Sequence, residues 1–162
     1  LQGICQGGQP IMSYNFGAGN KERVKKAFFT QLKVCTIFTS CFWLIMLLFP
    51  KLFAGIFSNN TDLITYTAWA LRIYMAGIFS LGFQVSCQQS FMALGQAKVS
   101  LLLACLRKLI LLIPLIFILP LFIQDKVFAV FLAEPISDIV AATITTITFM
   151  SRFNGILNRG KV

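Results

Sequence analysis

The sequence predicts an all-α membrane protein, a polytopic bundle of about five transmembrane helices. Of its 162 residues, 57% are hydrophobic and only 12% are charged, whereas a soluble domain carries about 25% charged residues. The apolar residues form runs of the length that an α-helix needs to cross roughly 30 Å of hydrocarbon. Lys and Arg gather in every second gap between these runs, a pattern typical of basic loops that stay on the cytoplasmic side.

The first predicted span covers residues 1–16 and contains no charged residue. Four polar residues, Gln2, Gln6, Gln9 and Ser13, recur at i, i+4, i+7 and i+11, so they share one helical face. The chain begins inside this apolar run and without an initiator Met. We therefore expect it to be a fragment of a longer membrane protein.

The second predicted span covers residues 27–49 and is closed by Pro50. The third covers residues 68–94, within an interval that has no charge between Arg72 and Lys98. The connection between them is aromatic and apolar before it becomes polar, which favours a short helix at the membrane surface. Its polar end offers three candidates for the N-cap of the following helix, namely Asn60, Thr61 and Asp62.

The fourth predicted span covers residues 99–122 and the fifth covers residues 127–150. The fifth carries two carboxylates, Glu134 and Asp138, one helical turn apart. A lone charge at the centre of the bilayer costs about 2.5–3.5 kcal/mol even on the lenient insertion scale. Each carboxylate therefore needs either a paired cation or a functional proton or ion.

A structural partner for these acids is available on the fourth span. Arg107 lies about 12 Å from the start of its span, and Asp138 lies about 16 Å from the start of the next, at 1.5 Å per residue. The two spans form an antiparallel hairpin, so these depths nearly coincide in a slab of roughly 30 Å. Arg107 or Lys108 could pair with Asp138, and Glu134 is the less obviously paired acid. A structural ion pair and an ion-coupling role for the two acids both stay open.

The glutamine-rich faces allow two interpretations. Gln84 and Gln88 lie one turn apart on the third span, as Gln6 and Gln9 follow one face of the first. Such amides can form hydrogen bonds between helices, worth about 0.6–2 kcal/mol each. They can also line a polar cavity, because polar groups in lipid must point inward.

The basic residues predict the topology. The gaps assigned to the cytoplasm hold eight: Lys21, Arg23, Lys25, Lys26, Lys98, Arg152, Arg159 and Lys161. The opposite gaps hold only Lys51 and Lys126. We therefore expect a multi-pass protein of the inner (plasma) membrane whose C-terminus is cytoplasmic.

Composition excludes several classes of function. The chain has no histidine, and none of its five cysteines belongs to a C-x-x-C pair. A zinc site is therefore not expected, and His-based acid–base or triad catalysis is excluded. We expect no metal site, no cofactor and no enzymatic activity. The net charge of +9 does not indicate a nucleic-acid partner, because the basic residues flank apolar runs and form no single stripe.

The segment from Gly3 to Val24 carries the most specific pattern. It fits G-x-x-Q-G-x-Q-P-x-x-S-Y-N-x-G-A-x-x-x-x-R-V and resembles a motif that ends the eighth of twelve helices in the multidrug and toxic compound extrusion (MATE) family of efflux antiporters. The matching positions include Gly3, Gln6, Gly7, Gln9, Pro10, Ser13, Tyr14, Asn15, Gly17, Ala18, Arg23 and Val24. The segment from Glu134 to Asp138 resembles the twelfth helix of the bacterial multidrug branch.

The resemblance implies that residues 1–162 form part of the C-terminal lobe, from the end of helix 8 through helix 12. The whole protein would export amphipathic organic cations in exchange for H⁺ or Na⁺, and its partners would be the lipid bilayer and the N-terminal lobe. It implies a cavity lined by Gln6, Gln9, Ser13, Tyr14, Asn15, Gln84 and Gln88, with aromatic walls such as Phe83 and Phe91. Glu134 and Asp138 are the ion-coupling candidates, and Arg107 and Lys108 the candidates for a structural ion pair.

One departure bears on ion coupling. Some family members carry an Asp in the tenth helix, near the position of Gln84, but this chain has no acid between Asp62 and Asp125. The coupling ion is therefore not assigned. Two other functions stay open: a flippase for lipid-linked saccharides, which would use the basic pair Arg107 and Lys108, and a truncated membrane piece that does not transport.

Overall fold

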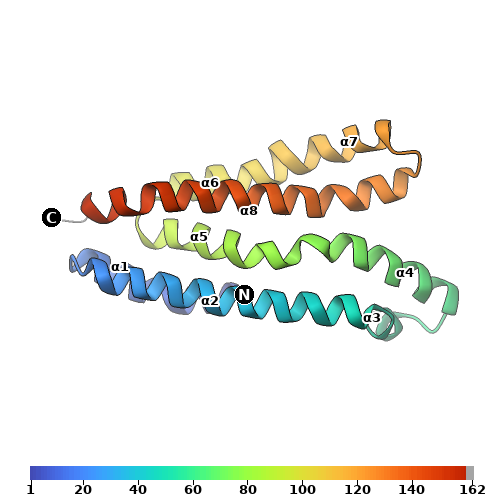
Figure 1. Cartoon of the computed structure of the whole chain (residues 1–162), viewed down its shortest axis with the longest axis horizontal. Coiled ribbons are helices and arrows are strands. Elements are labelled where there is room, and N and C mark those ends of the chain that lie inside the picture. Colours follow the sequence, from blue (N-terminus) through green and yellow to red (C-terminus); the bar gives the residue numbers. More distant parts are fainter. Residues whose placement is uncertain (160–162) are drawn as a thin grey trace.

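The computed structural model describes residues 1–159, with the side chain of Arg159 excepted, and contains only helices in that part of the chain. Apart from the short α3, the helices run lengthwise beside one another in an elongated bundle (Figure 1). Their bounds are α1 Gln2–Gly17, α2 Lys21–Leu48, α3 Pro50–Phe57, α4 Thr61–Tyr74, η1 Met75–Ser80, α5 Leu81–Ala93, α6 Ala97–Cys105, η2 Leu106–Leu112, α7 Ile113–Phe122 and α8 Lys126–Arg159.

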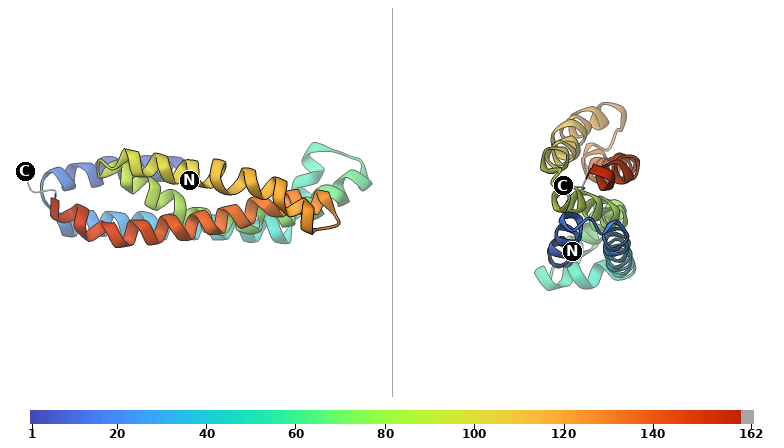
Figure 2. Two further views of the ribbon diagram at one scale, coloured as in Figure 1. Left: turned by 90° about the horizontal axis from the view of Figure 1, so that it is seen from above. Right: turned by 90° about the vertical axis from the view of Figure 1, so that its left-hand side faces the viewer.

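The helices form three layers (Figure 2). The middle layer is the nearly straight path of α4, the 3₁₀ segment η1 and α5. It packs on one side against α2, with α1 beside α5, and on the other side against α8. The outer layer beyond it is the hairpin of α8 with α6, η2 and α7.

Within the described residues, four helical stretches are long and apolar enough to cross a membrane: Lys21–Leu48, Thr61–Ala93, Ala97–Phe122 and Lys126–Asn158. The prediction of an all-α membrane bundle is therefore confirmed. The expected helix at residues 1–16 is also present as α1. Its 16 residues extend only about 24 Å at 1.5 Å per residue, so α1 is not among the stretches that meet the length for a crossing.

The helix ends differ from the predicted spans. The second span was placed at residues 27–49, but α2 begins at Lys21. The third was placed at 68–94, but its helix begins at Thr61. The fifth was placed at 127–150, but α8 continues to Arg159. The apolar run marks only part of a helix. At the start of α2, Lys and Arg continue the helix beyond it because their helix propensity is high. The helix of the third span starts at its N-cap, Asn60.

The connection between the second and third spans follows its prediction. The short helix α3 is present and begins with Pro50 in its first turn, where the missing N–H of proline costs nothing. Among the three N-cap candidates, Asn60 holds the position. Its Oδ1 accepts hydrogen bonds from the backbone N–H groups of Asp62 (3.0 Å) and Leu63 (3.3 Å).

The basic gaps gather at one end of the bundle. The α1–α2 turn, the α5–α6 turn and the end of α8 lie together, and α3 and the α7–α8 turn lie at the opposite end (Figure 1). Lys21 Nζ donates a hydrogen bond to Asn158 Oδ1 at 2.7 Å, which joins the start of α2 to the end of α8. The spacing of basic residues along the sequence thus corresponds to one basic end, although Lys161 lies outside the described residues.

An aromatic core joins the layers near this end. The ring centroid of Phe149 lies 4.6 Å from that of Phe28, 4.9 Å from that of Phe91 and 4.8 Å from that of Phe153. Phe91 is fully buried in this cluster. Phe91 therefore packs the helices together. The family resemblance implied that Phe91 forms a wall of a cavity, and the structure does not place it there.

Two glycines set the spacing of the middle layer. A Cβ at Gly82 would lie 2.9 Å from Thr36 Cα and 3.1 Å from the carbonyl oxygen of Cys35, both in α2. A Cβ at Gly77 would lie 2.8 Å from Pro135 Cα in α8. These backbone atoms leave no room for a side chain, so glycine lets η1 and α5 approach both neighbours closely.

Candidate functional site

The fourth predicted span contains a π-helical segment where its basic pair lies. Pro114 has no N–H, and its ring clashes with the carbonyl group four residues earlier. The chain widens over η2, where the Ile113 N–H donates to the carbonyl oxygen of Lys108. Such wide turns are rare and are frequently found at functional sites. In this chain the segment carries Arg107 and Lys108 on its side toward α8.

The facing segment of α8 carries the acids. Pro135 lies between Glu134 and Asp138 and removes one backbone donor from the helix. Ser137 Oγ donates a hydrogen bond to the carbonyl oxygen of Arg107 at 2.9 Å. This segment of α8 packs against η2 on one side and against η1 on the other, where η1 approaches closely at Gly77.

Arg107, Lys108, Glu134 and Asp138 form one connected group, the ion cluster. Arg107 Nε lies 2.7 Å from Asp138 Oδ1, and Arg107 Nη2 lies 3.8 Å from Glu134 Oε1. Lys108 Nζ lies 2.8 Å from the same Glu134 oxygen. Two cations thus meet two anions, and the formal charge of the ion cluster is zero.

Burial differs across the ion cluster. The side chain of Asp138 is 4% exposed, that of Glu134 13% and that of Arg107 20%, while Lys108 is 53% exposed. The contact expected between Arg107 and Asp138 is present. Glu134, expected to be the less obviously paired acid, also has a partner, because consecutive residues of the π segment both reach α8. The guanidinium group of Arg107 already binds Asp138 Oδ1, so this geometry favours a structural role over ion coupling.

The predicted cavity residues of α1 do not all share one surface. Gln6 and Ser13 are exposed and Gln9 is half-buried, on the one helical face that the spacing predicts. Ser13 Oγ donates to the carbonyl oxygens of Gln9 (3.0 Å) and Ala93 (2.9 Å), which ties α1 to the end of α5. Tyr14 is exposed on another face, and Asn15 is buried toward α2.

The two glutamines of α5 have different surroundings. Gln88 Nε2 donates to the carbonyl oxygen of Ser100 at 3.2 Å, and Ser100 Oγ donates to that of Gln88 at 3.1 Å. Gln88 thus makes the interhelical hydrogen bonds that were one of its two interpretations. Gln84 is buried, and its Oε1 has no hydrogen-bond partner among the described residues.

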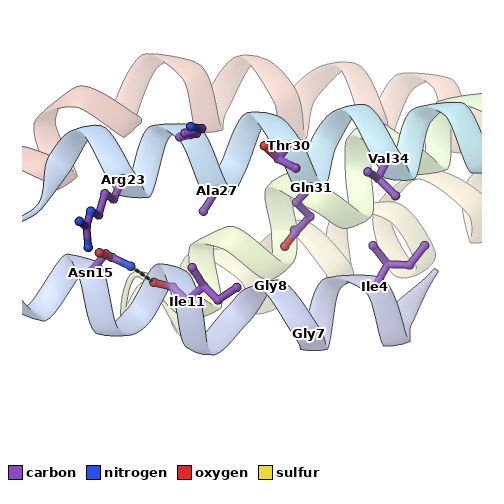
Figure 3. A pocket seen from close by; sticks show the side chains of 11 residues that line it. Ile4, Gly7, Gly8, Ile11, Asn15, Arg23, Ala27, Thr30, Gln31 and Val34 are labelled. Carbon is purple, nitrogen blue, oxygen red and sulfur yellow. Dashed lines mark hydrogen bonds between the residues drawn. The ribbon is translucent and has the colours of Figure 1, made fainter.

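Sequence reasoning missed a cleft between α1 and α2. Its volume is about 530 Å³, and its lining includes Asn15 and Gln31 (Figure 3). Gln31 interrupts the apolar run of the second span, the same signal that singled out Gln84 and Gln88. Ser137 was missed as well, because only the structure shows that its hydroxyl group bonds to the backbone of Arg107.

Comparison with known proteins shows the family of the chain. The family model MatE matches residues 1–118. The multidrug export protein MepA of Staphylococcus saprophyticus subsp. saprophyticus is 26% identical over 147 residues, which are 89% of this chain and 32% of that protein.

Two solved structures have the same fold. The MATE multidrug transporter DinF-BH, solved as a complex, is 30% identical, with a TM-score of 0.86 over 96% of this chain and 34% of its own. The inward-facing conformation of a multidrug resistance MATE family transporter of the MOP superfamily has a TM-score of 0.87 at 17% identity, over 98% of this chain and 36% of its own. This chain spans about a third of the length of these relatives. Because the family model covers most of its residues, the chain belongs to the MatE family of multidrug and toxic compound extrusion proteins.

Proposed function

We propose that the chain forms part of the C-terminal lobe of a secondary active multidrug efflux antiporter, from the end of helix 8 through helix 12. The observation that supports this most directly is the fit of 96% of the chain to DinF-BH, a MATE multidrug transporter, at 30% identity. The complete transporter would export amphipathic organic cations in exchange for H⁺ or Na⁺. It would lie in the inner membrane with the basic end of this bundle in the cytoplasm.

The neutral ion cluster determines which residues of the lobe can attract a cation. Because Arg107 and Lys108 already bind Asp138 and Glu134, none of the four carries an uncompensated charge. The cation would therefore meet amide groups such as Gln6 and Gln9, together with exposed aromatic faces such as Tyr14 and Phe83. Aromatic faces attract organic cations, and amide oxygens accept hydrogen bonds from them. A flippase for lipid-linked saccharides would need Arg107 and Lys108 to bind phosphate, but both are already paired within the ion cluster.

A chimera tests this proposal. Residues 1–162 replace the matching helices of a full-length MATE relative, and ethidium efflux is measured in intact cells. We expect efflux well above that of cells expressing the host with the same helices deleted. A chimera that reaches the membrane at the normal level but does not export ethidium would exclude the proposed function.

Replacing Gln6 and Gln9 together with Leu in this chimera is expected to lower ethidium efflux about fivefold. One lost hydrogen bond of about 1 kcal/mol corresponds to that factor. The matched control replaces Gln124 with Leu, because Gln124 is an exposed amide in the turn before α8. Equal efflux from both variants, at equal amounts of protein in the membrane, would show that the α1 amides do not contact the cation.

A further inference from the structure

The cleft between α1 and α2 lies apart from the ion cluster and from the polar face of α1. Ile4, Gly7 and Ile11 line it, and they follow a different helical face from Gln6 and Ser13. Figure 3 shows these residues opposite Thr30, Gln31 and Val34 of α2. The volume of about 530 Å³ falls in the range of about 300–1,000 Å³ that small-molecule sites occupy.

The cleft changes from basic to apolar along its length. Arg23 and Lys26 of α2 lie at one end, near the turn to α1. At the other end Ile4 and Val34 face each other across the opening (Figure 3). Neither basic side chain makes an ion pair within residues 1–159. A phospholipid has the same polarity, an anionic headgroup followed by an apolar chain.

The side-chain oxygens of two buried amides beside this cleft accept no hydrogen bond from the described residues. Asn15 is 8% exposed and Gln31 is 5% exposed, yet Asn15 Oδ1 and Gln31 Oε1 have no hydrogen-bond partner among the described residues. Asn15 Nδ2 donates to the carbonyl oxygen of Ile11 at 2.8 Å, and Gln31 Nε2 donates to that of Ser86 at 3.4 Å. With both amino groups engaged, the oxygens are left to accept. Buried acceptors normally have a partner, but Gln31 Oε1 packs against Gly8 of α1 and is closed to the open cleft.

We propose that this cleft binds one anionic glycerophospholipid of the phosphatidylglycerol type. Its phosphate contacts Arg23 and Lys26, because a guanidinium group binds phosphate in a bidentate manner. One acyl chain lies along Gly7 toward Val34. Basic pockets between transmembrane helices on the cytoplasmic side bind anionic headgroups in this way. An organic cation is a poor occupant, because Arg23 and Lys26 repel it.

Native mass spectrometry of the purified chain in mild detergent tests this site. The probes are dioleoyl-phosphatidylglycerol and dioleoyl-phosphatidylcholine, which differ only in the headgroup. We expect one phosphatidylglycerol per chain, bound at least about tenfold more tightly than phosphatidylcholine. Two Lys or Arg contacts to an anionic lipid account for a difference of that size. Equal affinity for the two lipids, or an added polypeptide mass in place of lipid, overturns the proposal.

Matched variants separate the cleft from general surface charge. Arg23→Gln with Lys26→Gln is expected to lower phosphatidylglycerol affinity about tenfold or more. Lys25→Gln with Lys33→Gln removes the same charge from residues of α2 that do not line the cleft, and its affinity is expected to stay within about twofold. An equal loss in both double variants contradicts a site in the cleft.

A second pair of variants keeps every charge. The Cβ of a residue at position 7 or at position 3 would meet nothing within 4 Å, so Gly7→Leu and Gly3→Leu both fit the backbone. Only Gly7 lines the cleft, so Gly7→Leu is expected to displace the acyl chain and Gly3→Leu to leave binding unchanged. Tight phosphatidylglycerol binding by folded Gly7→Leu, judged by circular dichroism, refutes the proposed position of the lipid.

Discussion

Replacing Asp138 with Asn is expected to lower the free energy of unfolding of the bundle by about 3–5 kcal/mol, the cost of removing one partner of a buried ion pair. The Asp138 side chain is 4% exposed and accepts from Arg107 Nε at 2.7 Å. Asparagine keeps the shape but leaves the guanidinium group with only Glu134, at 3.8 Å. Thermal unfolding in detergent and the amount of protein in the membrane measure the effect.

A double replacement identifies the cause. Arg107→Gln combined with Asp138→Asn removes both charges, and we expect it to recover much of the stability lost in the single variant. Glu134→Gln serves as a milder comparison, because its partner Lys108 is 53% exposed and can extend toward water. If Asp138→Asn leaves stability unchanged and abolishes efflux in the chimera, Asp138 couples the ion and is not a structural partner of Arg107.

Replacing Gly77 with Val is expected to be the most disruptive apolar substitution in the bundle. Even the first added carbon would lie 2.8 Å from Pro135 Cα, 3.0 Å from its carbonyl oxygen and 3.1 Å from Asp138 Cβ. Two of these atoms belong to the backbone of α8, so η1 and α8 have to move apart. Overpacking of a tight core costs about 1–3 kcal/mol, occasionally more. We expect a lower midpoint of thermal unfolding and a weaker contact between Arg107 and Asp138.

Gly55 provides the control for this substitution. It lies in the short helix α3, and an added Cβ would meet nothing within 4 Å. Gly55→Ala is expected to be neutral or slightly stabilising, because alanine is the better helix former, while Gly77→Ala already loses stability. Equal midpoints for the two alanine variants would show that α8 does not approach η1 as closely as the structure has it.

The fold class could be predicted from the sequence because hydrocarbon imposes a simple length and polarity requirement on each helix. The N-cap at Asn60 could also be predicted, because its chemistry is local. The start of α2 at Lys21 could not, since apolar length measures the bilayer and not the helix. The π segment before Pro114 could not be predicted either, because whether a proline kinks, breaks or widens a helix depends on the helices packed around it.

The candidate site was predicted only in part. Depth counting brought Arg107 close to Asp138, because two antiparallel helices share one coordinate across the membrane. It could not find the bond between Lys108 and Glu134, which depends on the wider π turn. Nor could it find the contact at Gly77, which is 58 residues from Pro135 in sequence. Asn15 was expected to line the same cavity as Gln6, although two residues beyond Ser13 correspond to about 200° around a helix.

The measurement that tests the account most directly is cysteine labelling of the chain in intact cells, after its native cysteines are replaced with Ser. Single cysteines are placed at Glu22 and Asn158, at the basic end, and at Asn59 and Gln124, at the opposite end. We predict that a membrane-impermeant maleimide labels positions 59 and 124 in intact cells, and positions 22 and 158 only after permeabilisation. Labelling of position 22 or 158 from outside, or a chain that stays monodisperse without detergent, would contradict the proposed membrane bundle and its orientation.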